Sequence, residues 1–249
     1  MNEKITASKS FIKFSLKKIL FSKRIIAVIA IIGFISAIMI YASTLDVDRL
    51  SQGANLLDTL ILSFFIPIVT MFYGSSILRD DIEDQSITQV LTCPLSRTST
   101  YILYYISLII SLAVITSLIT LSGFLAFFLP LKIDADALSI LLNMVVLSIL
   151  GSIVYSSLFL TVSVLLEKSI YFGLFYAFIW EGFIGSIPGR IQEFSIKHYI
   201  RSIASEWIEY GSISRFSGYS IGNAFLILFI LTVVLIVIGI LLFRNKEFP

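Results

Sequence analysis

The feature that most constrains the fold is a run without any charged residue, which extends from Thr98 to Leu131. One helical crossing of a bilayer needs about 20 predominantly apolar residues. This run is longer, so its ends must tilt, bend or extend into the headgroups, and Gly123 and Pro130 are the expected places for a change of direction. Apolar residues make up 57% and charged residues 14% of the chain, whose mean hydropathy is +0.98. The sequence therefore predicts an all-α, polytopic membrane protein.

The apolar runs predict six transmembrane helices within a single membrane domain, 1–249. Their expected bounds are about 25–43, 57–78, 100–129, 137–166, 169–188 and 221–243. Pro67 is predicted to kink the second span, because it has no N–H and frees a carbonyl one turn earlier. In the fourth span Ser148, Ser152 and Ser156 share one helical face, where small side chains let helices pack closely.

A basic segment precedes the first span. Within 8–24, Ile12, Leu16 and Ile19 recur at helical spacing while Lys13 lies off that stripe. This pattern is typical of an amphipathic helix on an anionic membrane surface. The alternative is a flexible basic lead-in.

The distribution of positive charge predicts the orientation. Six spans place both termini on one side, and the predicted inner segments hold twelve of the 18 Lys and Arg residues. Positive residues in short loops favour the cytosolic side. We expect a multi-pass protein of the cell (plasma) membrane, in contact with the lipid bilayer, with cytosolic N- and C-termini.

The longest polar interruption in the first two-thirds of the chain is the segment 79–97, between the second and third predicted spans. It holds four acidic residues, a set of apolar residues at helical spacing, and a proline and an arginine: Asp80, Asp81, Glu83 and Asp84; Ile87, Val90 and Leu91; Pro94 and Arg97. The acidic residues lack the spacing and turn glycine of a calcium loop. A solvated helix start is the simpler interpretation, since carboxylates favour the positive end of the helix dipole.

The sequence does not predict an enzyme. It has no G-x-x-x-x-G-K-[ST] loop for ATP, no G-x-S-x-G and no H-E-x-x-H. The single histidine, His198, and the single cysteine, Cys93, are too few for a zinc site or an internal disulfide. We expect no cofactor or metal in this chain and no nucleic-acid partner.

The uncharged run that begins the fifth predicted span ends at Trp180 and is too short to cross a bilayer by itself. Completing the crossing puts Glu181 within the outer leaflet. That carboxylate either faces the protein interior or a wet cavity, or extends to the outer headgroups. The following region, 181–219, is predicted to contain a short surface helix with His198 off its apolar face.

Two parts of the sequence are similar to permeases of type-2 ABC exporters. In that family, acidic residues, Gly-Thr-Leu, a leucine pair and Pro-x-Ser-Arg follow one another between the second and third spans. Here the corresponding stretches are Glu83–Ile87, Val90–Leu91 and Pro94–Arg97, with Gln85 and Ser86 in place of glycine and threonine, and Tyr104–Tyr105 where Gly-Lys is frequent. The second similarity begins at Trp180–Glu181, passes Pro188–Gly189 and reaches Ser195–Tyr199, the region after the fifth span.

The resemblance implies a permease subunit that pairs with a second permease subunit, expected to be a second copy, and with cytosolic ATPase subunits that bind ATP. The 79–97 segment would be the coupling helix in a groove of the ATPase, held by the acidic and apolar residues named above. Glu181, Gly182, Pro188 and Gly189 would belong to an outer gate and pathway, in a region spanning 181–219. The main alternative is a secondary transporter or channel without an ATPase, for which Glu181 is the one plausible ion-coupling group. An intramembrane enzyme is weaker, because no paired catalytic groups are present.

Overall fold

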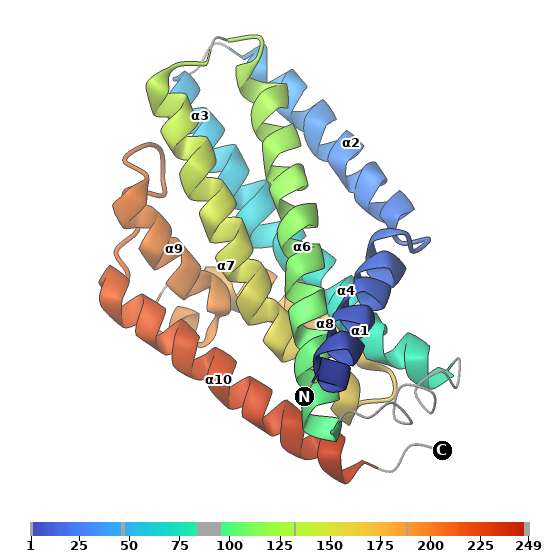
Figure 1. Ribbon diagram of the computed structural model, residues 1–249. Coiled ribbons are helices and arrows are strands. Elements are labelled where there is room, and N and C mark those ends of the chain that lie inside the picture. The colour runs from blue at the N-terminus through green and yellow to red at the C-terminus, as the bar shows by residue number, and fades with distance from the viewer. Residues whose placement is uncertain (1, 46–47, 84–95, 132, 188, 247–249) are drawn as a thin grey trace.

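Helices form nearly all of the chain that the computed structural model describes, which is residues 2–45, 48–83, 96–131, 133–187 and 189–246 (Figure 1). No strand occurs within these ranges, so the predicted all-α class is confirmed. Besides α-helices there are two π-helices, η1 and η2, and two 3-10 helices, η3 and η4. In chain order the elements are α1 Asn2–Leu20, α2 Ile25–Ser43, α3 Arg49–Leu56, η1 Leu57–Phe65, α4 Ile66–Glu83, α6 Arg97–Phe128, α7 Ala135–Leu165, α8 Ser169–Phe175, η2 Tyr176–Phe183, η3 Ile184–Ser186, η4 Arg190–Phe194, α9 Ile196–Trp207 and α10 Ile221–Asn245.

The central helix is α7, which packs against α4, α6 and α10. Its contact with α6 is made by small hydroxyl side chains. Ser148 and Ser152 lie 2.9 and 3.1 Å from the hydroxyls of Thr120 and Thr116, and all four side chains are fully buried. Small residues let the two backbones approach, and each hydroxyl also has a partner in its own helix. The close-packing role predicted for the serine face is confirmed.

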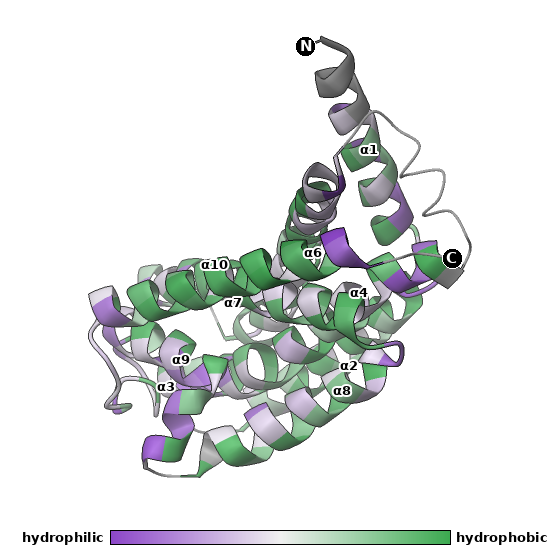
Figure 2. Cartoon of the chain, turned by 90° about the horizontal axis from the view of Figure 1, so that it is seen from below, coloured by the Kyte–Doolittle hydropathy of each residue, from purple (hydrophilic) through white to green (hydrophobic). Residues whose placement is uncertain are grey.

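Within the described part of the chain, five helical stretches are long and apolar enough to cross a membrane: Ile25–Ser43, Arg49–Ile82, Arg97–Phe128, Ala135–Leu165 and Ile221–Asn245. The outer helices α2 and α10 are apolar around much of their circumference (Figure 2). Large side chains such as Phe34, Phe229 and Ile26 are more than half exposed. Exposed apolar helix faces of this extent are suited to contact with lipid.

The predicted span 169–188 is not one long helix. Three short helices, α8, η2 and η3, follow one another from Ser169 to Ser186. The sequence predicted six spans, and five helices meet the length and apolarity that a crossing requires. At Tyr176 the helix type changes from α to π, a rare conformation that is frequent at functional sites.

Two predicted features of the long helices concern Pro67 and Gly123, and the kink at Pro67 stays a prediction. Near Pro67 the chain changes from the π-helix η1 to α4, and the Thr70 hydroxyl donates to the carbonyls of Ile66 (2.7 Å) and Pro67 (3.0 Å). In α6 the expected change of direction at Gly123 was wrong, because the helix continues to Phe128. Gly123 instead provides room for α2 and η1, since a Cβ there would lie 3.1 Å from side-chain atoms of both Ile35 and Ile61.

The basic N-terminal segment forms a helix, and the flexible lead-in is not what the structure shows. Its contact face is Phe11, Ser15 and Ile19, which are buried, while Ile12 and Leu16 are half-buried. Because α1 packs on α6, the ring of Phe11 stands edge-on to Tyr104 with centroids 4.9 Å apart. The helix therefore belongs to the folded bundle.

Candidate functional site

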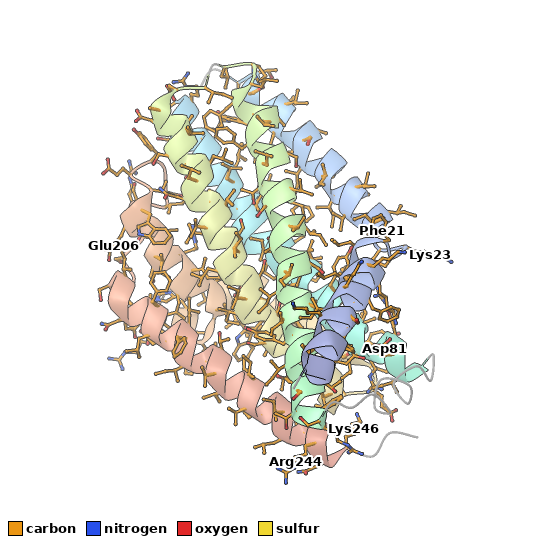
Figure 3. The ribbon with its side chains drawn as sticks, in the orientation of Figure 1. Phe21, Lys23, Asp81, Glu206, Arg244 and Lys246 are labelled. Atoms are coloured by element: carbon orange, nitrogen blue, oxygen red, sulfur yellow. The ribbon has the colours of Figure 1, made fainter. Side chains whose placement is uncertain are left out.

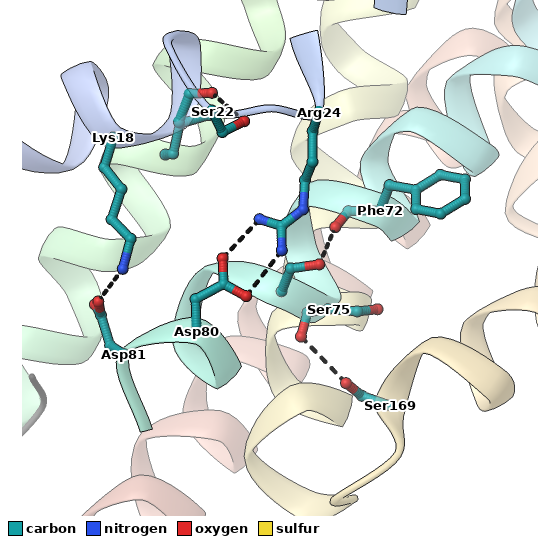
Figure 4. Close-up of polar contacts among 10 residues, drawn as sticks. Lys18, Ser22, Arg24, Phe72, Ser75, Asp80, Asp81 and Ser169 are labelled. Atoms are coloured by element: carbon teal, nitrogen blue, oxygen red, sulfur yellow. Dashed lines mark hydrogen bonds and ion pairs between the residues drawn. The ribbon is translucent and has the colours of Figure 1, made fainter. Parts of the chain in front are cut away.

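The C-terminal turns of α4 carry Asp80 and Asp81, the first two acidic residues of the predicted coupling segment, and both pair with the N-terminal basic region (Figure 4). Arg24 holds Asp80 through both of its terminal nitrogens, each 2.8 Å from a carboxylate oxygen. Asp81 is buried, where it forms an ion pair with Lys18 and accepts a hydrogen bond from Tyr104. A two-point arginine–carboxylate contact fixes direction as well as distance. The start of α2 and the end of α1 are thereby joined to the end of α4.

The other end of the predicted coupling segment is fixed by Ser96 and Arg97. Ser96 caps α6 by accepting a hydrogen bond from the N–H of Ser99 at 3.1 Å. The guanidinium of Arg97 donates to the backbone carbonyls of Arg244 (2.9 Å) and Lys246 (3.0 Å), at the end of α10. A cation is favourable at a helix C-terminus, where carbonyls lack helical partners. Ser96 therefore caps the start of α6, and Arg97 binds the C-terminal end of α10.

The remaining residues of this predicted site are not placed. The backbone of Glu83 ends α4, and its side chain is outside the described part of the chain. Five further predicted residues also lie outside the described residues: Asp84, Ile87, Val90, Leu91 and Pro94. Their role in coupling stays a prediction.

Glu181, from the predicted outer gate, lies in the protein interior with no exposed surface. Its carboxylate accepts hydrogen bonds from the Tyr176 hydroxyl (2.8 Å), the Ser195 hydroxyl and the backbone N–H groups of Ile196 (3.0 Å) and Lys197 (3.3 Å). The last two are the first N–H groups of α9, which have no partner within the helix. Of the two interpretations offered by the sequence, extension to the headgroups is therefore wrong. Glu181 caps α9 from another segment and joins it to η2.

The glycines predicted for the outer gate lie on either side of η3. Gly182 is within η2. Gly189 precedes η4 with φ 116°, a left-handed conformation that favours glycine because it has no Cβ. Pro188, between them, lies outside the described residues. These residues lie in the connection between η2 and α9.

A buried ion pair that the sequence analysis missed joins the second long helix to α9. Asp58 is 1% exposed, and its Oδ2 lies 2.7 Å from Nη2 of Arg201. From its place at the end of the second predicted span, Asp58 would be expected to be an interfacial residue, but it is buried and paired with Arg201 of α9. The available signal was an isolated carboxylate in an apolar run, which is costly unless it has a partner in the protein.

A polar cavity of about 630 Å³ lies beside α9 and is lined by residues of η4 and of the loop before α10. His198 faces this cavity and is buried, with its ring edge-on to Tyr199, Phe216 and Tyr219. Burial lowers the pKa of His198 from its ordinary value, an effect that Glu193 opposes and Arg201 reinforces. The imidazole is therefore neutral at physiological pH.

Opposite charges also join the loops at this end of the molecule. Arg49 pairs with Asp134, which caps α7 by accepting from the N–H of Ala137 at 3.1 Å. That hydrogen bond lowers the pKa of the Asp134 carboxyl, and the Arg49 charge lowers it further. Glu206 lies far from Asp81, Arg244 and Lys246, which mark the other end of the bundle (Figure 3).

Long apolar helices with lipid-suited faces, and polar contacts gathered at the two ends, define a multi-pass membrane protein. The family model described as ABC-2 family transporter protein matches residues 15–248, nearly the whole chain. The chain belongs to this family and is thus a membrane component of an ABC transporter, as the sequence resemblance implied. No curated protein matches the chain in sequence.

Proposed function

We propose that the chain is the permease subunit of an ATP-driven exporter, and that a separate ATPase subunit binds and hydrolyses the ATP. The observation that carries the proposal is the family match over residues 15–248, because it includes the predicted coupling segment and the predicted outer region. The sequence has no phosphate-binding loop of its own. ATP energy must then enter through a contact with another protein.

The geometry at the end of α4 supports the coupling role of 79–97. This segment follows α4 without a break in the helix as far as Glu83, and it leads directly into α6 at Arg97. Movement of the segment would act on two long helices at once. Because Asp80 and Asp81 are paired with Arg24 and Lys18, it would also act on α1 and α2. With the contact of Arg97 to the end of α10, the segment is connected to five helices.

We assign this end to the cytosol and the α9 end to the outer side, with α9 and η2 forming the outer gate. Positive residues gather where α1, α4 and α10 end, which favours the cytosolic side. A second copy of the chain would complete the pathway between the two permeases. The exported substrate class is left open by these features.

The alternative, a transporter or channel without an ATPase, requires an acidic group free to exchange an ion. Glu181 is poorly suited to that task because four donors already surround its carboxylate. A caged carboxylate of this kind favours a structural role. The ATP-driven function is therefore the better supported of the two.

The test is to reverse two acidic residues of the predicted coupling segment other than Asp80 and Asp81, with Glu83→Lys and Asp84→Lys combined. The tagged protein is purified from its native membranes, and co-purification of an ABC ATPase and ATP hydrolysis are measured. The wild type is expected to retain both. The double variant is expected to lose both, because the lysines would replace the negative charges by which the segment binds the groove of the ATPase. The matched control is Asp48→Lys with Asp136→Lys, two exposed acidic residues at the other end. Equal retention of the ATPase by the coupling variant and the control would contradict the proposal.

A further inference from the structure

An apolar slot of about 280 Å³ runs between α2 and α4 at the end of the bundle that carries α1. Each helix lines it with residues at the spacing i, i+3, i+4, i+7, which places them on one face. On α2 these are Arg24, Ala27, Val28 and Ile31, and on α4 they are Val69, Phe72, Tyr73 and Ser76. From Arg24 to Ile31 the slot extends for about 10 Å along the helix axis.

A polar pocket of about 310 Å³ adjoins the slot, and the two share Arg24, Ser76 and Ile170. Its charged lining consists of Arg24, Arg79, Asp80, Glu167 and Lys168. Three positive charges thus face two negative ones, and both oxygens of Asp80 are already held by Arg24. The pocket has an excess of one positive charge.

Arg79 provides an independent indication of a ligand. Its Nε donates to the carbonyl of Leu166 at 3.2 Å, which holds the side chain in place. Its Nη2 is buried and has no hydrogen-bond partner among the residues that the structure describes. A buried donor without an acceptor is costly, so an oxygen-rich group that enters the pocket would be stabilised there.

We propose that the slot and the polar pocket together bind one anionic phospholipid. The phosphate lies against Arg24, Arg79 and Lys168, and one acyl chain lies in the slot. One phosphodiester carries one negative charge, which matches the excess charge of the pocket. Tyr171, at the rim of the pocket, is 70% exposed, as expected for an aromatic side chain at headgroup depth. Basic pockets between membrane helices bind anionic lipid headgroups in this manner.

The site would make anionic lipid part of the connection between α2 and α4, since Arg24 contacts both the lipid phosphate and Asp80. This inference does not rest on the ATPase partnership. Its test measures lipid affinity of the isolated chain and needs no ATPase, so the two proposals fail separately.

The test is native mass spectrometry of the delipidated full chain, titrated with phosphatidylglycerol or phosphatidylcholine. Wild type is expected to bind the first phosphatidylglycerol at least about tenfold more tightly than phosphatidylcholine, with about fivefold from each nearby positive charge. The combined variant Arg79→Gln, Lys168→Gln should remove most of that preference. The matched control, Lys23→Gln with Arg244→Gln, removes two exposed positive charges from the same end and should keep it.

The slot is tested separately by Ala27→Trp, which fills it, against Ala30→Trp, an exposed position of the same helix outside the slot lining. Only Ala27→Trp should weaken binding of phosphatidylglycerol. Equal affinity of wild type for the two lipids, or equal loss in a variant and its control, would overturn the proposal. Displacement of the lipid by inorganic phosphate alone would identify a free-anion site instead. A change in oligomeric state with unchanged lipid affinity would assign the slot to a second copy of the chain.

Discussion

Two buried carboxylates of this protein, Glu181 and Asp58, differ in their hydrogen-bond partners and therefore in their structural roles. Glu181 has four donors around it and closes the N-terminus of α9. Asp58 forms an ion pair with Arg201, and its Oδ1 has no hydrogen-bond partner among the described residues. The first is a stable cap, whereas the second depends on α9 staying in place. Glu181 couples α9 to η2, and Asp58 couples α9 to the second long helix.

Replacement of Glu181 should destabilise the α9 region. Glu181→Ala leaves the Ser195 hydroxyl and two N–H groups without an acceptor, so the free energy of unfolding should fall by about 2–4 kcal/mol. Glu181→Gln keeps one acceptor oxygen and should cost less. Unfolding in detergent measures both, with the exposed Glu209→Ala as a control expected to stay within about 0.5 kcal/mol. If Glu181→Ala were as stable as Glu209→Ala, the capping role would be refuted.

The pH dependence of stability should reflect His198. Its folded pKa is lowered below the ordinary 6.5, so the unfolded chain binds the proton more readily. The stability that neutral His198 contributes is complete above the unfolded value and is lost progressively as the pH falls below it. His198→Phe keeps a ring among Tyr199, Phe216 and Tyr219 but cannot titrate. Since the chain has one histidine, the drop in Tm between about pH 8 and pH 5 should be smaller in the variant. An identical drop would exclude His198 as its source.

At the scale of elements, the long helices could be predicted from sequence and the interrupted ones could not. Uncharged runs fixed α2, α6, α7 and α10 because a bilayer requires apolar length and little else. The π-helices η1 and η2 left no such signal, since their residues are as apolar as their neighbours. Their position depends on contacts from distant segments, such as that of Glu181 with α9.

The contact between α1 and α4 likewise could not be predicted from local sequence patterns. The acidic residues after α4 and the basic residues before α2 were each visible in the sequence. That Asp80 pairs with Arg24 and Asp81 with Lys18 follows only from how α1 packs on α6. The charged residues of the site could be identified from the sequence, whereas their pairing is determined by the tertiary packing.

Charge exchange tests this contact. Arg24→Asp places two carboxylates together and should release α1, whereas adding Asp80→Arg should restore the attraction. The distance between spin labels at the exposed positions Lys13 and Tyr171, in a Cys93→Ser background, should broaden in the single variant and narrow again in the double one. A partly exposed pair contributes about 1 kcal/mol or less, so the effect should be on local order and not on overall folding. Unchanged distances in the single variant would show that the ion pair does not hold α1.

The whole molecule combines two polar ends with an apolar middle, and the proposed orientation of these ends rests on the distribution of charge. The single cysteine, Cys93, lies in the segment assigned to the cytosol. A membrane-impermeant maleimide should therefore label it in inside-out vesicles and not in intact cells. In the Cys93→Ser background, Ser214→Cys at the exposed loop before α10 should show the opposite pattern. Labelling of Cys93 in intact cells would contradict the cytosolic assignment of this segment and indicate the opposite topology.

The most direct test of the central claim is site-specific photo-crosslinking from position 87 in native membranes. A photoreactive amino acid replaces Ile87, one of the apolar residues predicted to anchor the coupling helix, and the same replacement at the exposed Leu138 serves as the reference. The proposed function predicts a crosslink from position 87 to an ABC ATPase, and none from position 138. A crosslink from neither position, or to the ATPase from both, would contradict the claim that residues 79–97 couple this permease to ATP hydrolysis.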